Sequence, residues 1–251
     1  MKKYIALALA LCLAFTLVAC GGSASSAPAS SAPASSAPAA SEPAAEAGLT
    51  TVTAGKLTMS TNAAFPPYEM TDDAGNYIGI DVEVAQAIAE KLGLELVIDN
   101  MEFTAALEAA QNGKSDMVMA GVSVTDERKQ VMCFSDSYAT GIQVVIVKEG
   151  SDVTMDNLGE KMIGTQMGTT GYIYASDSPE NGGYGEDNVL AYDNGITAVQ
   201  ALLNGQIDAV IIDNAPAQAF VAENPGLKIL EAEWVTENYA IGLAKGNTVL
   251  R

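Results

Sequence analysis

The feature that most restricts the fold is an alternation of short apolar runs with helix-like segments, which occurs twice between residue 54 and the end of the 251-residue chain. This alternation predicts an α/β fold with largely parallel sheets. The first set contains expected strands at residues 56–60, 94–98 and 116–120, a helix capped by Asp81 and ended by Gly93, and a helix at 104–111. The second set follows an apolar run at residues 141–147 and contains expected strands at 161–165, 189–192 and 209–212 and expected helices at 170–176 and 196–203.

Two successive α/β sets predict two lobes. Lobe 1 is expected to hold residues 54–137 together with 240–251, and lobe 2 residues 143–234. Two crossing segments, 138–142 and 235–239, would form the hinge, because the last expected strand returns the chain to lobe 1. Ligands of open α/β sheets gather beyond the carboxyl ends of the strands, so we expect a ligand in the cleft between the lobes.

The N-terminus has the layout of a secretion signal. Lysines follow Met1, residues 4–19 are almost wholly apolar, and small residues precede Cys20. The apolar stretch is shorter than the roughly 18 to 20 residues of a membrane-spanning helix, so we expect residues 1–19 to be a signal peptide that is removed. The order Leu-Val-Ala-Cys resembles the lipobox of bacterial lipoproteins, which implies a lipid such as palmitate on Cys20. An ordinary secretory signal that contains a cysteine is the alternative.

Residues 20–53 are expected to form a lipid-anchored linker. Most of this stretch consists of Ala, Ser, Pro and Gly, with a repeated Ser-Ser-Ala-Pro-Ala unit. It cannot bury enough apolar surface to order itself, and a coil of roughly 30 residues reaches on the order of 30 Å. The linker would hold the globular part outside the cytoplasm and near the cell membrane, either in a periplasm or on the outer face of a Gram-positive membrane.

The composition argues against several classes of function. The formal net charge is −19 and no basic stripe is visible, so we do not expect a nucleic-acid partner. The chain has no histidine, the commonest general base and metal ligand, and we expect neither a metal nor a cofactor. Gly113-Lys114-Ser115 lacks the upstream glycine of a P-loop. Cys133 would be the one cysteine of the mature globular part, in an apolar setting that favours packing over reactivity.

Three segments that follow expected strand ends carry polar or aromatic residues. They are STNAAFPPYEM (60–70), AGVSVTDERK (120–129) and AVIIDNAP (209–216). Four further segments belong with them: GIDVEVAQAIAEKLG (79–93), FSDSY (134–138), IGTQMGTTG (163–171) and NYAIGLAKG (238–246). In this order, the seven segments resemble bacterial extracellular solute-binding protein family 3, the amino-acid-binding subunits of ABC importers.

The resemblance has several implications. It implies a two-lobed periplasmic-binding-protein-like fold of type II, with a hinge between the lobes and a free amino acid as the ligand. It also implies the permease subunits of an ABC transporter as partners. Members of the family normally continue with a closing C-terminal helix, which we expect this chain to lack.

A free amino acid is a zwitterion, so its pocket needs one fixed cation and one fixed anion. Arg128 offers a planar fork that holds a carboxylate with two hydrogen bonds. Asp213 ends an expected strand and can face an ammonium group. The alternatives are a solvated charge for Arg128 and a helix cap for Asp213. The resemblance assigns Arg128 to the α-carboxylate and Asp213 to the ammonium group.

Other candidate ligand-binding residues surround this pair. Ser123 is expected to offer its hydroxyl to the carboxylate, and Gly121 and Thr170 are expected to offer backbone N–H groups. The resemblance adds Phe65 and Phe103 as an aromatic cover, Asn62 and Gln166 at the end of the ligand side chain, and Ala120 beside Gly121.

The expected ligand is an uncharged, polar amino acid. Asn62 and Gln166 are both neutral, whereas a pocket for lysine or arginine would want an acid, because an unpaired buried cation is costly. Glu69 and Asp193 leave this choice open. Two other functions compete: an exported cyclohexadienyl or arogenate dehydratase on the same fold, with Glu69 as general acid, and a ligand-sensing ectodomain. The aromatic cover and the zwitterion pair favour binding over catalysis, so we do not expect an enzyme.

Overall fold

The computed structural model describes residues 49–230, 235–247 and 250. The expected signal peptide, Cys20 and the expected linker up to residue 48 lie outside this described part. Within it, no helix is both long and apolar enough to cross a membrane.

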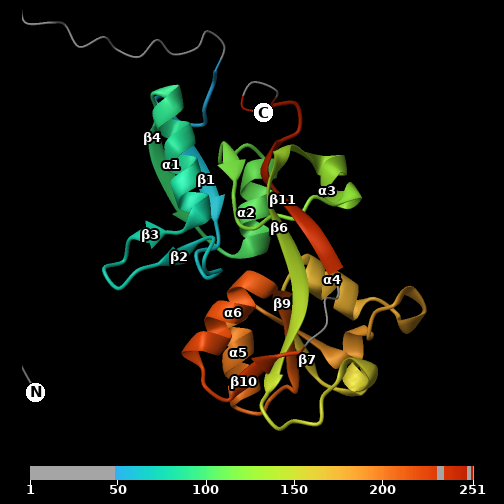
Figure 1. Ribbon diagram of the computed structural model, residues 1–251. Coiled ribbons are helices and arrows are strands. Elements are labelled where there is room, and N and C mark those ends of the chain that lie inside the picture. Colours follow the sequence, from blue (N-terminus) through green and yellow to red (C-terminus); the bar gives the residue numbers. More distant parts are fainter. Residues whose placement is uncertain (1–48, 231–234, 248–249, 251) are drawn as a thin grey trace, which may run out of the picture. The chain divides into compact units, whose positions relative to one another are not determined.

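The first half of the described chain is an α/β unit built on β1. This strand pairs in parallel with β4 on one side and with β5 on the other. Helices α1 and α2 both contact β1 (Figure 1). The elements of this half are β1 (Lys56–Thr61), β2 (Met70–Thr71), β3 (Tyr77–Ile78), α1 (Ile80–Leu92), β4 (Glu95–Asn100), α2 (Phe103–Gln111), β5 (Met117–Val118) and α3 (Asp126–Val131).

The second half repeats this plan around β7. This strand pairs in parallel with β8 and with β9, and α4 and α5 contact it. The elements of this half are the 3-10 helices η1 (Met155–Glu160), η2 (Pro179–Asn181) and η3 (Glu186–Asn188), the strands β7 (Ile163–Gln166), β8 (Val189–Tyr192), β9 (Ala209–Asp213) and β10 (Leu227–Ile229), and the helices α4 (Thr170–Ser176), α5 (Gly195–Leu203) and α6 (Asn214–Glu223).

Two long strands, β6 (Met132–Lys148) and β11 (Val235–Ala244), join the halves (Figure 1). They pair with each other in antiparallel fashion, with an irregular register around Tyr239 and Ala240. The sheet order is β4-β1-β5-β11-β6-β9-β7-β8. The predicted two-lobed α/β fold is confirmed, with one correction. The outer strands of each half are parallel, but the central β6 and β11 run antiparallel to their neighbours. Periodicity indicates that a segment is buried and does not indicate its direction.

Each half has its own apolar core. In the first half, Ala85 of α1 packs with the fully buried Leu57 of β1. In the second half, Leu202 of α5 packs with Val210 of β9. Burying one such leucine contributes about 1.5–3 kcal/mol, so each half has a local source of stability.

The start of α1 differs from the prediction that Asp81 caps this helix. The cap position is occupied by Gly79, whose φ of 121° suits glycine alone, and a side chain there would collide with the backbone of Tyr68. Asp81 lies inside the first turn and is fully buried. Its Oδ2 accepts hydrogen bonds from the Gly121 N–H at 3.2 Å and from the Tyr138 hydroxyl at 2.9 Å. The helix ends as predicted, with Gly93 in a left-handed conformation.

The strand expected at residues 116–120 is shorter than predicted. Only Met117 and Val118 are paired as β5, although the backbone N–H groups of Asp116 and Met119 also donate to β1. The Asp116 carboxylate accepts hydrogen bonds from the backbone N–H groups of Val52 and Thr58. Cys133 is half-buried and packs against the cluster around Leu57, with its Sγ 3.2 Å from the carbonyl oxygen of Ala244. The packing role predicted for this cysteine agrees with that environment.

Candidate ligand-binding site

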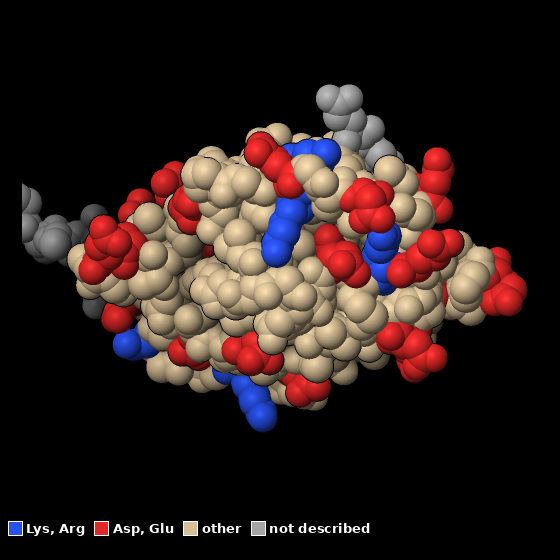
Figure 2. All heavy atoms as spheres, turned by 90° about the horizontal axis from the view of Figure 1, so that it is seen from below, with Lys and Arg blue, Asp and Glu red and all other residues tan. Residues whose placement is uncertain are grey.

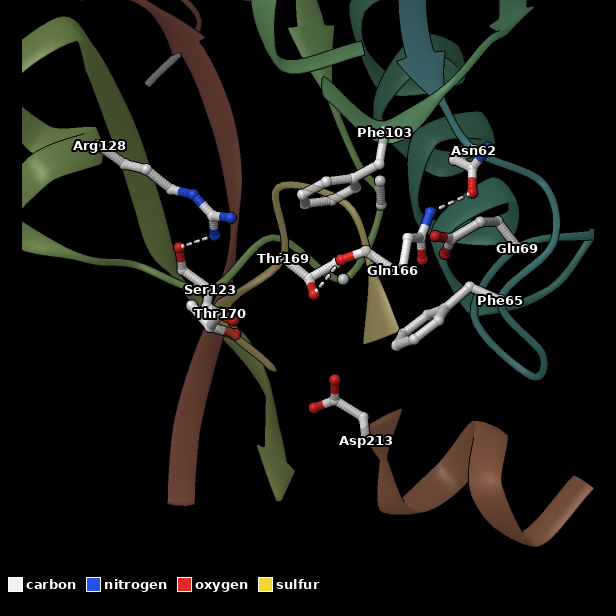
Figure 3. A pocket seen from close by; sticks show the side chains of 12 residues that line it. Asn62, Phe65, Glu69, Phe103, Ser123, Arg128, Gln166, Thr169, Thr170 and Asp213 are labelled. Atoms are coloured by element: carbon white, nitrogen blue, oxygen red, sulfur yellow. Dashed lines mark hydrogen bonds between the residues drawn. The ribbon is translucent and has the colours of Figure 1, made fainter. Parts of the chain in front are cut away.

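A small pocket lies where segments of the two halves meet (Figure 3). All ten predicted ligand-binding residues line it, and Glu69 and Thr169 join them. The predicted members are Asn62, Phe65, Phe103, Ala120, Gly121, Ser123, Arg128, Gln166, Thr170 and Asp213.

Arg128 is positioned by the short helix α3, whose first turn is capped by the hydroxyl of Thr125. Its guanidinium donates hydrogen bonds to the carbonyl oxygens of Ser123 at 2.8 Å and Gly168 at 3.1 Å. The guanidinium carbon also lies 5.5 Å from the centre of the Phe103 ring, within the range of a cation–π contact. Burial lowers the pKa of Arg128, but an arginine keeps its charge in proteins. Arg128 is therefore a fixed cation with donors left for an anion.

The polar groups beside Arg128 bond differently from the prediction. The Ser123 hydroxyl, expected to serve a ligand carboxylate, donates to Oε2 of Glu237 at 3.0 Å. The Thr170 hydroxyl donates to the same oxygen at 2.7 Å. The Gly121 N–H, also expected to face the ligand, donates to Asp81. Two acids that sequence reasoning did not place in the site therefore organise its polar wall.

The backbone conformation at position 121 requires glycine. The residue has a φ of 55°, and a Cβ would lie 2.8 Å from the ring of Phe65. The chain thus approaches the aromatic ring more closely than any side chain would allow. Gly121 shapes the pocket through this close approach as well as through its N–H group.

Asp213 lines the same pocket as Arg128 and, when ionised, carries the opposite charge. It ends β9 and directly precedes α6, but its side chain does not cap that helix. The carboxylate instead accepts hydrogen bonds from the Tyr239 hydroxyl and from Nε2 of Gln143, the latter at 2.8 Å. It is 8% exposed, and burial raises its pKa to about 7. A cation placed beside it would favour the ionised form.

The two predicted aromatic residues come from separate segments of the first half, and both line the pocket (Figure 3). Phe65 stacks on Tyr68 with ring centres 5.8 Å apart, and Tyr68 meets Tyr239 edge to face at 5.3 Å. Phe103 begins α2 and lies beneath Arg128. The rings are therefore held by further contacts before any ligand arrives.

Asn62 and Gln166 lie together at the end of the pocket away from Arg128 (Figure 3). Nε2 of Gln166 donates to Oδ1 of Asn62 at 2.9 Å and to the backbone carbonyl of Asp193 at 3.1 Å. Nδ2 of Asn62 donates to the carbonyl of Met101 at 2.8 Å. The Asp193 side chain is exposed, so this residue contributes its backbone. The two amides thus bond to each other across the two halves.

Glu69 lies beside these amides and is only 1% exposed (Figure 3). Neither of its carboxyl oxygens receives a hydrogen bond from a donor group in the described part of the chain. The acid beside it is Asp81, whose N–H donates to the carbonyl oxygen of the preceding Tyr68 at 2.9 Å, and a hydrogen bond between the two carboxyl groups requires a proton on one of them. Burial and the Asp81 charge raise the pKa of Glu69 well above the ordinary range. Glu69 thus adds a second acid to the pocket. The sequence alone does not decide whether this residue contacts the ligand side chain.

The surface shows a similar excess of acids. On the face drawn in Figure 2, Asp and Glu side chains are spread widely and only a few Lys and Arg side chains lie among them. In the pocket, Arg128 is the sole cation among the lining residues, against Glu69 and Asp213. The site is thus electrostatically suited to a ligand that carries positive charge or hydrogen-bond donors.

Comparison with known proteins gives the wider context. A probable histidine-binding protein of Neisseria gonorrhoeae is 34% identical over 98% of this chain and 85% of its own length. The arginine-bound form of truncated ArgBP from T. maritima is 38% identical, with a TM-score of 0.73 over 78% of this chain and 91% of that one. Two structures of an ancestral arginine-binding protein, one bound to arginine and one to glutamine, are each 38% identical with TM-scores of 0.72. They cover 78% and 79% of this chain, and 87% and 88% of their own chains.

A match to a family model identifies the protein family of this chain. The model of the bacterial extracellular solute-binding proteins, family 3, matches residues 57–251, which includes both halves of the fold and every residue that lines the pocket. By this match the chain is a member of the bacterial extracellular solute-binding proteins of family 3, and the similar proteins reported above are binding proteins, not enzymes.

Proposed function

We propose that this protein is the solute-binding subunit of an ABC importer and holds a free amino acid between its two lobes. The observation that carries the proposal is one pocket lined by both Arg128 and Asp213, which arrive from different halves of the fold. A zwitterion can pair its carboxylate with the first and its ammonium group with the second. Charge-assisted hydrogen bonds of this kind are about twice as strong as neutral ones.

The ligand class follows from the other end of the pocket. The neutral pair Asn62 and Gln166 favours the uncharged polar amino acid that the sequence predicts, whereas the buried Glu69 can also receive a cation. We propose a polar amino acid whose side chain carries hydrogen-bond donors, with glutamine and arginine as reference ligands. The similar ancestral protein bound to either amino acid supports this class.

We further propose that the lobes close on the ligand. Lobe 1 would comprise residues 54–137 and 240–251, lobe 2 residues 143–234, and the hinge the paired segments 138–142 and 235–239. The antiparallel pairing of β6 with β11 supports this hinge, because these strands connect the halves. A ligand that binds the closed state better than the open one supplies the driving force.

The membrane anchor belongs to the same proposal. A lipid on Cys20 and the linker at 20–53 would hold the protein near the transporter permease. Replacement of Cys20 by serine should release the protein from the membrane fraction of cells, because the lipid has no thiol to join. Retention of the variant in membranes after a high-salt wash would contradict the anchor and leave amino-acid binding untouched.

A thermal-shift screen of the twenty common amino acids, followed by calorimetry, tests the central claim. A ligand at about 100 times its dissociation constant stabilises the protein by about 2.7 kcal/mol. The N-acetyl and amide forms of each hit are the controls, since each lacks one of the two charges. The proposal fails if no amino acid stabilises the protein, or if the N-acetyl form binds as tightly as its parent.

A further inference from the structure

Glu69, which lines the pocket, and Asp81, which does not, form a pair of buried acids for which the proposed function does not account. Asp81 comes from the first turn of α1, and Glu69 from the loop that follows β1. The two segments lie against each other, because the Asp81 N–H donates to the carbonyl oxygen of Tyr68, the residue before Glu69, at 2.9 Å. Oδ2 of Asp81 is occupied by the Gly121 N–H and the Tyr138 hydroxyl. Within the described residues, neither Oδ1 of Asp81 nor either oxygen of Glu69 receives a hydrogen bond from a donor group.

Among the residues that the structure describes, no cation compensates the charge of this pair. The titratable groups that face Glu69 and Asp81 are Tyr138 of β6, Asp213 at the end of β9, and Tyr68 of the same loop as Glu69. None of them is positively charged at neutral pH. The cation of the pocket, Arg128, bonds to Ser123 and Gly168. Two buried carboxylates in this setting would repel each other strongly, and one shared proton removes that cost.

Resting on the proposed function, we propose that Glu69 and Asp81 share one proton in the empty pocket, and that this proton selects between uncharged and cationic ligand side chains. With the proton present, Glu69 donates to Asp81 and offers the pocket a neutral oxygen that can accept a hydrogen bond from an amide. With the proton lost, Glu69 offers a carboxylate that can pair with a guanidinium. One pocket can then take both classes of side chain.

The raised pKa of Glu69 determines how the relative affinities for arginine and glutamine change with pH. Burial raises the pKa of Glu69 well above its ordinary value, so the empty protein keeps the proton above the usual carboxyl range. Arginine favours the ionised pair, so its affinity relative to glutamine should rise as pH rises through the raised pKa. Below that pKa, arginine binding should release about one proton more than glutamine binding does. Asp213 must ionise for either ligand, so its own titration cancels in the ratio of the two affinities.

Calorimetry with arginine and glutamine between about pH 5 and pH 9 tests the proposal, in buffers of different ionisation enthalpy so that released protons are counted. The variant Glu69→Gln fixes the neutral state. At high pH this variant should bind arginine about 10–100-fold more weakly than the parent protein does, and its affinity for glutamine should stay within about threefold of the parent's. The ratio of its arginine and glutamine affinities should not change with pH. Glu83→Gln is the matched control, because it removes an exposed acid from the same helix as Asp81 and should behave like the parent protein.

Several results would overturn the proposal. One is an affinity ratio that does not change with pH in the parent protein, and another is equal weakening of both ligands by Glu69→Gln. If neither amino acid binds, the proposed ligand class fails, and the selection role fails with it. The shared proton is tested separately by infrared spectroscopy of the empty protein at neutral pH, in an Asp213→Asn background that removes the acid band of Asp213. The carboxylic-acid C=O band should be present in Asp213→Asn and lost when Glu69→Gln is added, and its absence from Asp213→Asn would refute the shared proton whatever binds.

Discussion

The two ends of the pocket are built in opposite ways. At the carboxylate end, formed by Arg128, Ser123 and Gly168, the cation is held by two backbone carbonyls and an aromatic ring before a ligand arrives. At the side-chain end, formed by Glu69, Asn62 and Gln166, the two amides bond to each other while Glu69 lacks a donor in the described structure. The comparison suggests that the group common to all amino acids meets a preorganised partner. The side chain, which differs between amino acids, lies beside a buried acid that needs a hydrogen-bond donor from the ligand or a proton.

The largest effect is expected from breaking the carboxylate end with Arg128→Lys. Lysine keeps the charge but loses the planar fork, so it cannot hold both carbonyl oxygens and a carboxylate at once. Losing about 3 kcal/mol of charged hydrogen bonds corresponds to roughly 100-fold weaker binding, which calorimetry would measure. Thermal unfolding of the empty protein should change little. An affinity within about threefold of the parent would show that Arg128 does not hold the carboxylate.

The next effect concerns Asp213, which stands between the two ends. Burial raises its pKa to about 7, and a proton on it competes with the ligand ammonium group. Glutamine affinity should therefore be constant above that pH and fall about tenfold for each pH unit below it. The empty protein should lose stability as pH rises from about 4 to 7, because an acid with a raised pKa costs free energy when it ionises in the folded state. In Asp213→Asn the affinity should be low at every pH, and a slope that survives in this variant would assign the titration to another group.

A smaller loss should follow if Asp213 is displaced rather than removed. Gly141 of β6 lies so close to Asp213 and Tyr239 that a Cβ would collide with the carboxylate and the hydroxyl. In Gly141→Ala, both groups must move, and overpacking of this kind costs about 1–3 kcal/mol of stability. We expect about tenfold weaker binding, equivalent to about 1.4 kcal/mol. Gly159→Ala is the control, because a Cβ there makes an ordinary contact of 3.5 Å with Tyr184. Equal effects of the two substitutions would remove Gly141 from the site.

Much of this site could be predicted because its residues follow strand ends. Parallel strands bring their carboxyl ends to one edge, so Asn62 after β1 and Asp213 at the end of β9 could be placed in a common cleft. The partners of these residues could not be predicted. Ser123 and Glu237 are separated by 114 positions, and Gly121 and Asp81 by 40, and no local pattern links such pairs.

The helices and strands also divide into those that local sequence defines and those that depend on contacts with distant segments. Helix α4 and strand β8 have the predicted bounds, because local periodicity and turn residues define them. The direction of β11 and the true cap of α1 depend on contacts with distant segments. Asp81 has the residue type of a helix cap, but it is buried beside Glu69, and that neighbour is set by tertiary packing alone.

The smallest effect should come from the aromatic support of the carboxylate end. Phe103 lies 5.5 Å from the Arg128 guanidinium carbon and lines the pocket. In Phe103→Leu most of the apolar contact remains while the cation–π attraction is lost, a change of about 0.5–1 kcal/mol. Every amino acid ligand should therefore bind about two- to fivefold more weakly, whatever its side chain. Phe134→Leu is the matched control, since Phe134 is buried in the same apolar cluster but does not line the pocket. Both variants should lose similar stability, and only Phe103→Leu should lose affinity. If the two variants bind alike, the ring stabilises the core of lobe 1 and does not position Arg128.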